Sequence, residues 1–234
     1  MDLIFNLKEE ELNFTDSKKD VLKFLKIIGV DSRFISYTSN KIYINNLRFS
    51  KLSKAKEKTF KKQYPEIDVV RSSLFQKICA RSSKVLSRDL KPGDTVLLLK
   101  KDNSINNLLT IVLEPYTRKY GVKLINKGEA NLKVSSEFLD KEVNTVLSGI
   151  FEGKGIDFRK KDGVLYPFIN IPKEWLNSFL EMENFDLIKE EKFSSSSEIL
   201  ADSFMEFLSN IVPQYRENVL VSKEYLNENS KAKQ

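Results

Sequence analysis

Hydrophobic positions follow two periodicities in the middle of the chain. A short apolar run over 95–100 comes after the turn Lys91-Pro92-Gly93-Asp94 and predicts a buried strand. Apolar residues then recur three and four positions apart up to about Tyr120, which predicts a helix, and residues 122–125 predict a second strand. Because two strands joined by a helical crossover of this length form a βαβ unit, we expect a parallel sheet with a right-handed crossover.

The rest of the pattern predicts further helices and strands on both sides of this unit. The predicted helices cover 17–28, 69–90, 134–150, 172–182 and 198–211, and the predicted strands are a hairpin within 34–47 and segments near 163–169 and 185–188. We expect residues 1–70 to form a small α+β N-terminal appendage, residues 71–226 an α/β domain, and residues 227–234 a flexible tail.

The loop after the first strand of the βαβ unit has the position of a ligand site but unusual residues. Ligands of parallel sheets bind beyond the carboxyl ends of the strands, where a strand meets the following helix. Here that loop is Lys101-Asp102-Asn103-Ser104. A phosphate-binding loop needs glycines so that backbone N–H groups approach the anion, and this loop has none. Asp102 would also repel phosphate, so the position predicts a nucleotide site that the residues do not support.

Composition removes several kinds of chemistry. The 234 residues include no histidine and one cysteine, Cys79. This excludes an intrachain disulfide, a cysteine-rich metal site and nucleophiles activated by histidine, so no metal site and no catalytic residue are predicted. We expect Cys79 to be a buried structural thiol. No run reaches the ~20 apolar residues of a membrane span, and the acidic start does not look like a signal peptide, so we expect a cytoplasmic protein without membrane contact.

The charge is moderately basic, with a formal net charge of +6 and a pI of about 9.1. Such an excess suits RNA but is shared by many other proteins. Two segments concentrate it. One is the lysine run 51–62, and the other is a row that falls on one helix face: Lys77, Arg81, Lys84 and Arg88. Each segment is either a solvated helix face or a surface that contacts RNA phosphates.

The segment FQKICARSSKVLSRDLKPGDTVLLLKKDNSINNLL resembles the ATP-using tRNA thiolation enzymes of the PP-loop superfamily. Those enzymes have a basic helix, a turn, a strand, a Ser-Gly-Gly-x-Asp-Ser loop and a helix. A gapless match places six residues on that loop: Lys101, Asp102, Asn103, Ser104, Ile105 and Asn106. Both glycines, the aspartate and both serines are missing. The later stretches VLYPFINIPKEW and SSSSEILADSFMEFLSNIVPQYRENVL are similar to the C-terminal part of the same family.

The resemblance implies a parallel sheet of the adenine-nucleotide alpha hydrolase-like, Rossmann-like type. With the loop signature and the family's catalytic cysteines absent, the chain looks most like the non-catalytic subunit of the heterodimer that 2-thiolates the wobble uridine (U34) of cytosolic tRNA. It implies a pseudoenzyme without a cofactor, which stabilises a catalytic PP-loop paralogue and helps to hold tRNA through Lys77, Arg81, Lys84 and Arg88. Two alternatives stay open: a protein-interaction module with no RNA role, and an active ATP-dependent tRNA-modifying enzyme with a diverged loop.

Overall fold

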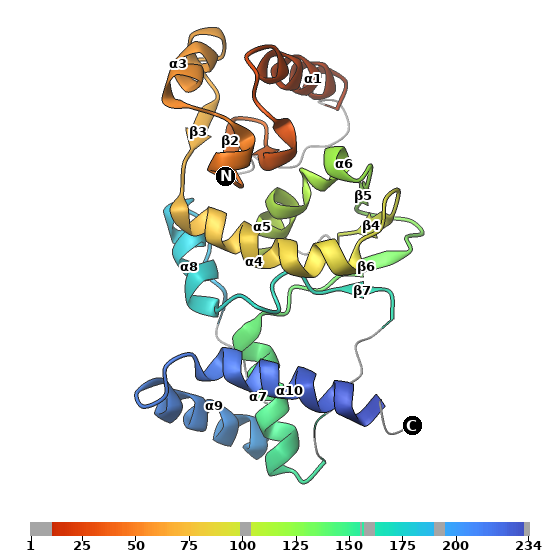
Figure 1. Cartoon of the computed structure of the whole chain (residues 1–234), viewed down its shortest axis with the longest axis vertical. Helices are drawn as coiled ribbons and strands as arrows, with labels where there is room; N and C mark the ends of the chain where they lie inside the picture. Colours follow the sequence, from red (N-terminus) through yellow and green to blue (C-terminus); the bar gives the residue numbers. More distant parts are fainter. Residues whose placement is uncertain (1–10, 99–103, 155, 157–161, 190–194, 232–234) are drawn as a thin grey trace.

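The computed structural model describes residues 11–98, 104–154, 156, 162–189 and 195–231. Three parts follow one another along the long axis of the molecule (Figure 1). An N-terminal α+β part lies at one end, a parallel sheet with its helices lies in the middle, and a group of C-terminal helices lies at the other end. None of the helices within the described ranges is long and apolar enough to cross a membrane.

The N-terminal part is built on a three-stranded sheet of order β1-β2-β3. The predicted hairpin is confirmed, since β1 and β2 pair antiparallel, whereas β3 joins β2 in parallel. The elements of this part are α1 (Glu11–Ile27), η1 (Ser32–Phe34), β1 (Ile35–Tyr37), β2 (Lys41–Ile44), α2 (Leu47–Ser50), α3 (Lys54–Gln63) and β3 (Asp68–Val70). Helix α1 begins six residues before the predicted 17–28.

Both faces of this small sheet are covered. Ile35, Ile42 and Ile44 pack with side chains of α1 and α3 in one core cluster. The opposite face carries Ser36, whose hydroxyl donates to the Ile111 carbonyl of α5 at 2.5 Å, and Tyr43, which joins the core of the middle part. Side chains that alternate between two covered faces explain why β1 is buried throughout and β2 is buried in all but its first residue.

The middle part confirms the predicted parallel sheet. Its four strands have the order β5-β4-β6-β7, and each neighbouring pair is parallel. The strands are β4 (Thr95–Leu97), β5 (Lys123–Ile125), β6 (Leu132–Val134) and β7 (Val164–Leu165), and the helices of this part are α4 (Ser73–Asp89), α5 (Ser104–Leu113), α6 (Tyr116–Lys119) and α8 (Lys173–Met182). The predicted helix up to Tyr120 is thus two helices, because Pro115 has no N–H to continue the ladder of α5.

Three other predicted boundaries are wrong for identifiable reasons. The helix predicted over 69–90 begins at Ser73, because Val69 and Val70 pair with β2. The helix predicted over 134–150 begins at Leu139 and is preceded by β6, which was not predicted. The segment 185–188 is not a strand, since its amides are satisfied elsewhere: Phe185 N–H donates to the Leu180 carbonyl at 2.8 Å and Ile188 N–H donates to the side chain of Asn177 at 3.0 Å.

The C-terminal helices form a core of their own with the helix that follows β6. These helices are α7 (Leu139–Phe151), α9 (Ser196–Ser209) and α10 (Tyr215–Lys231). Their buried side chains are Leu139, Val143, Leu147, Ala201, Met205, Tyr215 and Leu220. Helix α10 continues to Lys231, into the segment expected as a tail.

Candidate functional site

The topology of the parallel sheet indicates where a ligand would bind. From β4 the chain passes to β5 on one side, then returns to β6 on the other side of β4 and continues to β7. The connections therefore diverge between β4 and β6. In open α/β sheets such a switch point leaves a crevice at the carboxyl ends of the two strands. We call this place the β4/β6 edge, and it is the position that the sequence predicts for a nucleotide site.

Residues of α5 and of the loop after β6 build the β4/β6 edge. Ser104 and Asn106 lie half-buried in the first turn of α5, while Ile105 is buried in the core and cannot contact a ligand. The other predicted loop residues lie outside the described residues: Lys101, Asp102 and Asn103. After β6, the Ser135 hydroxyl accepts a hydrogen bond from the Glu137 amide at 3.2 Å. The described residues at this edge therefore include the hydroxyl-bearing Ser104 and Ser135 and the amide-bearing Asn106.

A cavity of about 360 Å³ lies alongside the first turns of α5. That volume falls within the range of small-molecule sites. Its lining residues come from the β1–β2 hairpin, α5 and the segment after α8: Thr38, Ser39, Asn40, Lys41, Tyr43, Asn107, Thr110, Ile111, Glu183 and Phe185. Hydrogen-bonding amides and hydroxyls thus surround an apolar surface with two aromatic rings, an arrangement that suits a planar polar ligand.

Glu183 is the buried charge of this cavity. Its carboxylate accepts hydrogen bonds from Lys41 Nζ and from Tyr43 Oη, each at 2.8 Å, and only 9% of the residue is exposed. Burial and the neighbouring Glu183 carboxylate raise the pKa of Tyr43, so the phenol stays a donor. Sequence reasoning missed Glu183, because a single acidic residue at the end of an amphipathic helix gives no pattern.

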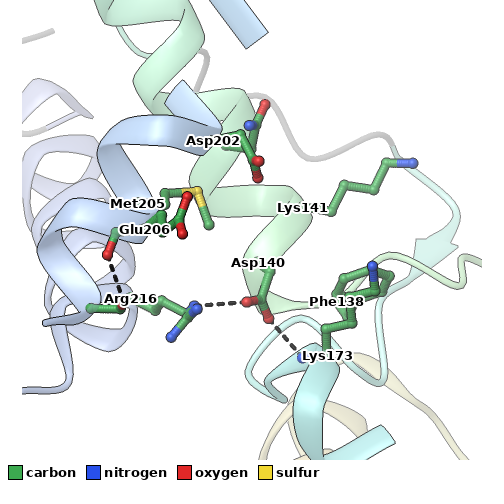
Figure 2. A pocket seen from close by; sticks show the side chains of 10 residues that line it. Phe138, Asp140, Lys141, Lys173, Asp202, Met205, Glu206 and Arg216 are labelled. Atoms are coloured by element: carbon green, nitrogen blue, oxygen red, sulfur yellow. Dashed lines mark hydrogen bonds and ion pairs between the residues drawn. The ribbon is translucent and has the colours of Figure 1, made fainter. Parts of the chain in front are cut away.

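A second cavity, of about 470 Å³, lies among α7, α9, α10 and the start of α8 (Figure 2). Asp140 is central to it. One carboxylate oxygen accepts the Lys173 backbone N–H at 2.7 Å, and the other is 2.7 Å from Arg216 Nε. Because these charges neutralise one another, Asp140 joins α7 to α8 and α10, and we assign the cavity a structural rather than a catalytic character.

The predicted basic row lies on α4, but its members differ in their surroundings. Lys77, Lys84 and Arg88 are exposed. Arg88 pairs with the adjacent Asp89 at 2.7 Å. Helix α4 ends shortly before β4 begins, so the end of α4 that carries Arg88 lies toward the amino ends of the strands, and the end that carries Lys77 lies toward their carboxyl ends. The row therefore leads away from the β4/β6 edge rather than around it, and its contact with RNA stays a prediction.

Arg81 makes internal contacts. Its Nη1 atom donates to the Asn170 carbonyl at 2.8 Å and lies 3.1 Å from a carboxylate oxygen of Glu217 on α10. Its guanidinium carbon is 4.3 Å from the ring centroid of Trp175 on α8. These contacts hold α4, α8 and α10 together, so the main role of Arg81 in this structure is structural.

Cys79 is buried in the middle core, as predicted. Burial raises the pKa of its thiol well above the ordinary value, against a smaller lowering by a hydrogen bond with Asn45. A thiol held in its neutral form is a poor nucleophile and a poor metal ligand. The one cysteine of the chain is therefore unsuited to carrying sulfur.

Two known proteins to which this chain is similar are named as a sulfurtransferase and a tRNA thiolase. No protein-family model matches the chain. A probable sulfurtransferase of Methanocaldococcus jannaschii is 27% identical over 117 residues, which cover 49% of this chain and 32% of that protein. The matched segment thus spans about a third of the relative's length. Among solved structures, the U34-tRNA thiolase NcsA of Methanococcus maripaludis, solved with its [4Fe-4S] cluster, superposes with a TM-score of 0.51 and 13% identity. That match covers 71% of this chain and 83% of the thiolase, and it shows the fold.

These relatives confirm one expectation and overturn another. The predicted α/β fold with a parallel sheet is confirmed, and the solved thiolase structure shares this fold. The expectation that the chain is a non-catalytic pseudoenzyme is wrong by this comparison, because both relatives are named as enzymes. Neither relative supports an assignment to the non-catalytic subunit, the cytoplasmic tRNA 2-thiolation protein 2.

Proposed function

We propose that this chain acts in the thiolation of tRNA at the wobble uridine, U34. The observation that carries the proposal is the parallel sheet of order β5-β4-β6-β7, which matches the fold of a U34-tRNA thiolase. The partial sequence match to a probable sulfurtransferase supports the same chemistry independently. The net charge of +6 suits a nucleic-acid substrate. In this proposal the reacting groups meet at the β4/β6 edge.

The sulfur must come from outside the chain. An iron–sulfur cluster of the kind named for the M. maripaludis enzyme is held by several cysteine thiolates, and this sequence offers one buried cysteine. The residues present therefore do not fit such a cluster. We propose that a second PP-loop chain pairs with this one and supplies the thiols, while this chain contributes the β4/β6 edge and part of the tRNA-binding surface.

Deleting the protein from its native cells tests the proposed function. The expected result is the loss of 2-thiouridine at position 34 of the tRNAs that normally carry it, measured by mass spectrometry of tRNA nucleosides. Other modified nucleosides of the same tRNAs serve as the internal control, and expression of the full chain should restore the thiolation. An unchanged 2-thiouridine content would overturn the proposal.

Charge reversal at the exposed members of the α4 row tests the predicted RNA contact and keeps Arg81 itself. The variant K77E/K84E/R88E should weaken tRNA binding and reduce the slope of log K against log salt by about two, since each lost phosphate contact lowers it by ~0.7–0.9. The matched control K77R/K84R/R88K keeps every charge at the same exposed positions. Equal affinities of the two variants would remove α4 from the RNA surface.

A further inference from the structure

Helices α1 and α3 form the outermost layer of the N-terminal part (Figure 1). The ring of Phe24 on α1 lies 6.4 Å from the ring of Phe60 and 5.6 Å from the ring of Tyr64, so the two helices pack side by side. Their apolar faces are buried in one core with the strands β1 and β2. The opposite faces of both helices therefore point into solvent, away from the sheet.

Lysines dominate these outer faces. Five of them are exposed, and their side chains make no ion pair or hydrogen bond with the described residues: Lys23, Lys26, Lys54, Lys58 and Lys62. We call this set the outer lysine face. Its three members on α3 recur every four residues, which separates them by ~6 Å along the helix axis.

The remaining charges of α3 point elsewhere. Lys56 Nζ donates to the Gly29 carbonyl at 2.6 Å, and Lys61 pairs with Asp68 at 3.0 Å. Glu57, the one acidic residue of α3, pairs with Arg71 beyond β3. The Glu57 carboxylate therefore points toward the strands, whereas the three α3 lysines of the outer lysine face point outward. Among the side chains described on the outer face of α1, the exposed acidic one is Asp20. The outer lysine face therefore keeps a net positive charge.

We propose that the outer lysine face is an RNA-binding surface that contacts tRNA phosphates at a distance from the β4/β6 edge. This rests on the proposed function, which supplies tRNA as the polyanion. Lysines that project in a row from a rigid helix neutralise a phosphate backbone without reading its sequence. The surface would set the position and orientation of the tRNA, while the β4/β6 edge acts on the base.

The same observations argue against two other occupants. A helix that binds a membrane surface inserts a free apolar face, whereas the apolar faces of α1 and α3 are buried against the sheet. Ile27 is the large exposed apolar side chain within the described part of these two helices. Protein interfaces favour aromatic residues and arginine and are depleted in lysine, the reverse of this surface.

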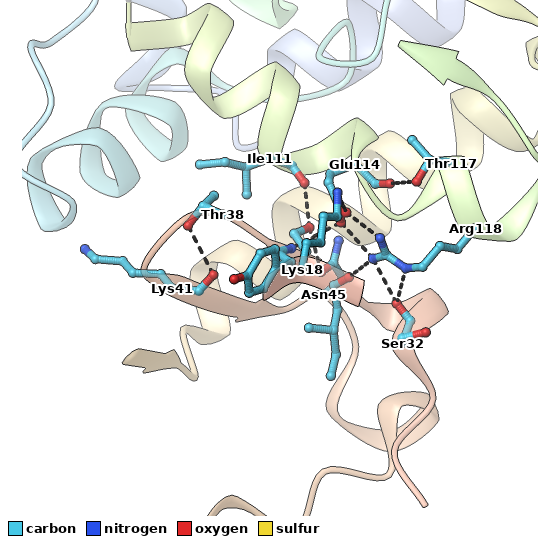
Figure 3. A network of polar contacts seen from close by, with 12 residues as sticks. Lys18, Ser32, Thr38, Lys41, Asn45, Ile111, Glu114, Thr117 and Arg118 are labelled. Carbon is cyan, nitrogen blue, oxygen red and sulfur yellow. Dashed lines mark hydrogen bonds and ion pairs between the residues drawn. The ribbon is translucent and has the colours of Figure 1, made fainter. Parts of the chain in front are cut away.

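The N-terminal part is also attached firmly enough to hold bound RNA in a fixed place. Glu114, at the end of α5, accepts the Tyr37 N–H at 3.1 Å and pairs with Lys18 at 2.8 Å (Figure 3). Arg118 pairs with the same carboxylate and donates to the Ile35 carbonyl at 2.6 Å. Helix α5 begins at the β4/β6 edge, so one rigid element connects the edge to the layer beneath the lysines.

The test is tRNA binding by the full chain carrying K54E/K58E/K62E, measured by fluorescence anisotropy over a range of salt concentrations. We expect at least a ten-fold loss of affinity at low salt and a salt slope reduced by about two to three, because three phosphate contacts are lost. The control K54R/K58R/K62R keeps the charge and should bind like the original chain. Circular dichroism checks that each variant is folded. If K54E/K58E/K62E does not fold, the neutral variant K54Q/K58Q/K62Q takes its place in the test.

The outcomes separate this proposal from the proposed function. Unchanged binding by K54E/K58E/K62E, with weaker binding by the α4 reversal, would overturn the outer lysine face and leave the proposed function in place. Loss of 2-thiouridine on deletion, together with no tRNA binding by the chain, would also overturn this inference alone. Tighter binding to anionic phosphatidylserine vesicles than to tRNA, abolished by the same reversal, would assign the surface to a membrane and overturn the proposal.

Discussion

Arg81 fits the basic row in the sequence but serves the fold in the structure. Its spacing from Lys77, Lys84 and Arg88 matches a helix face, and nothing in that spacing reveals that Trp175 and Glu217 would lie beside it. Both partners are more than ninety positions away along the chain. Helical periodicity therefore predicted which side chains share a face, whereas the partners of each charge depend on tertiary packing.

Replacing Arg81 should destabilise the protein more than it weakens RNA binding. R81A removes a hydrogen bond to a backbone carbonyl, a partly exposed ion pair and a contact with an aromatic ring, so we expect a loss of about 1–3 kcal/mol in the free energy of unfolding. Urea denaturation measures this loss. The control K84A alters an exposed lysine of the same helix and should stay within about 0.5 kcal/mol. A fully stable R81A that binds tRNA poorly would instead place Arg81 on the RNA surface.

At the scale of elements, long periodic segments were predictable and short strands were not. The βαβ unit around 95–125 was identified because its apolar runs are bounded by a turn and joined by a helical repeat. Strand β6 has three residues, with exposed Lys133 between Leu132 and Val134, and it merges with the apolar pattern of α7. Because β6 was not predicted, one of the two strands that form the β4/β6 edge was overlooked, and the residues after it were not considered as site residues.

The start of α4 depends on one capping hydroxyl. The Ser72 side chain accepts the Phe75 N–H at 3.1 Å, and Ser72 has the extended backbone of an N-cap. S72A should cost about 1 kcal/mol in the free energy of unfolding, and S72G only a few tenths, because glycine leaves the exposed amides open to water. Thermal or urea unfolding of the pair compares the two. A loss in S72A no larger than a few tenths of a kcal/mol would show that the cap hydrogen bond contributes little here.

At the scale of the whole molecule, the exposed positive charge is divided between two separate surfaces. The row on α4 begins near the carboxyl ends of the parallel strands, and the outer lysine face lies on the far layer of the N-terminal part. Composition alone gave the net charge of +6 but not this division. Which lysines are free follows from the folded structure, since Lys56 and Lys61 lie in the same run and are bound.

The junction between the N-terminal part and α5 makes the stability of the whole molecule depend on pH. Burial alone would raise the pKa of Glu114, but Arg118 and Lys18 outweigh it and hold the pKa below the ordinary value of 4.5. A carboxyl group with a lowered pKa in the folded state stabilises the protein above its unfolded pKa, and this contribution is lost as the pH falls through the folded value. The junction should therefore weaken on acidification below about pH 4.5.

Replacing Glu114 by glutamine isolates this effect. At pH 7, E114Q should lose about 3 kcal/mol in the free energy of unfolding, because Arg118 keeps its carbonyl partners but lacks its buried counter-charge. The gap between the original chain and E114Q should narrow as the pH falls, since only the original chain has this carboxylate to protonate. Urea denaturation between pH 7 and pH 3 measures it, with E129Q as the exposed control. A gap that stays constant over that range would mean that Glu114 contributes packing rather than charge to this junction.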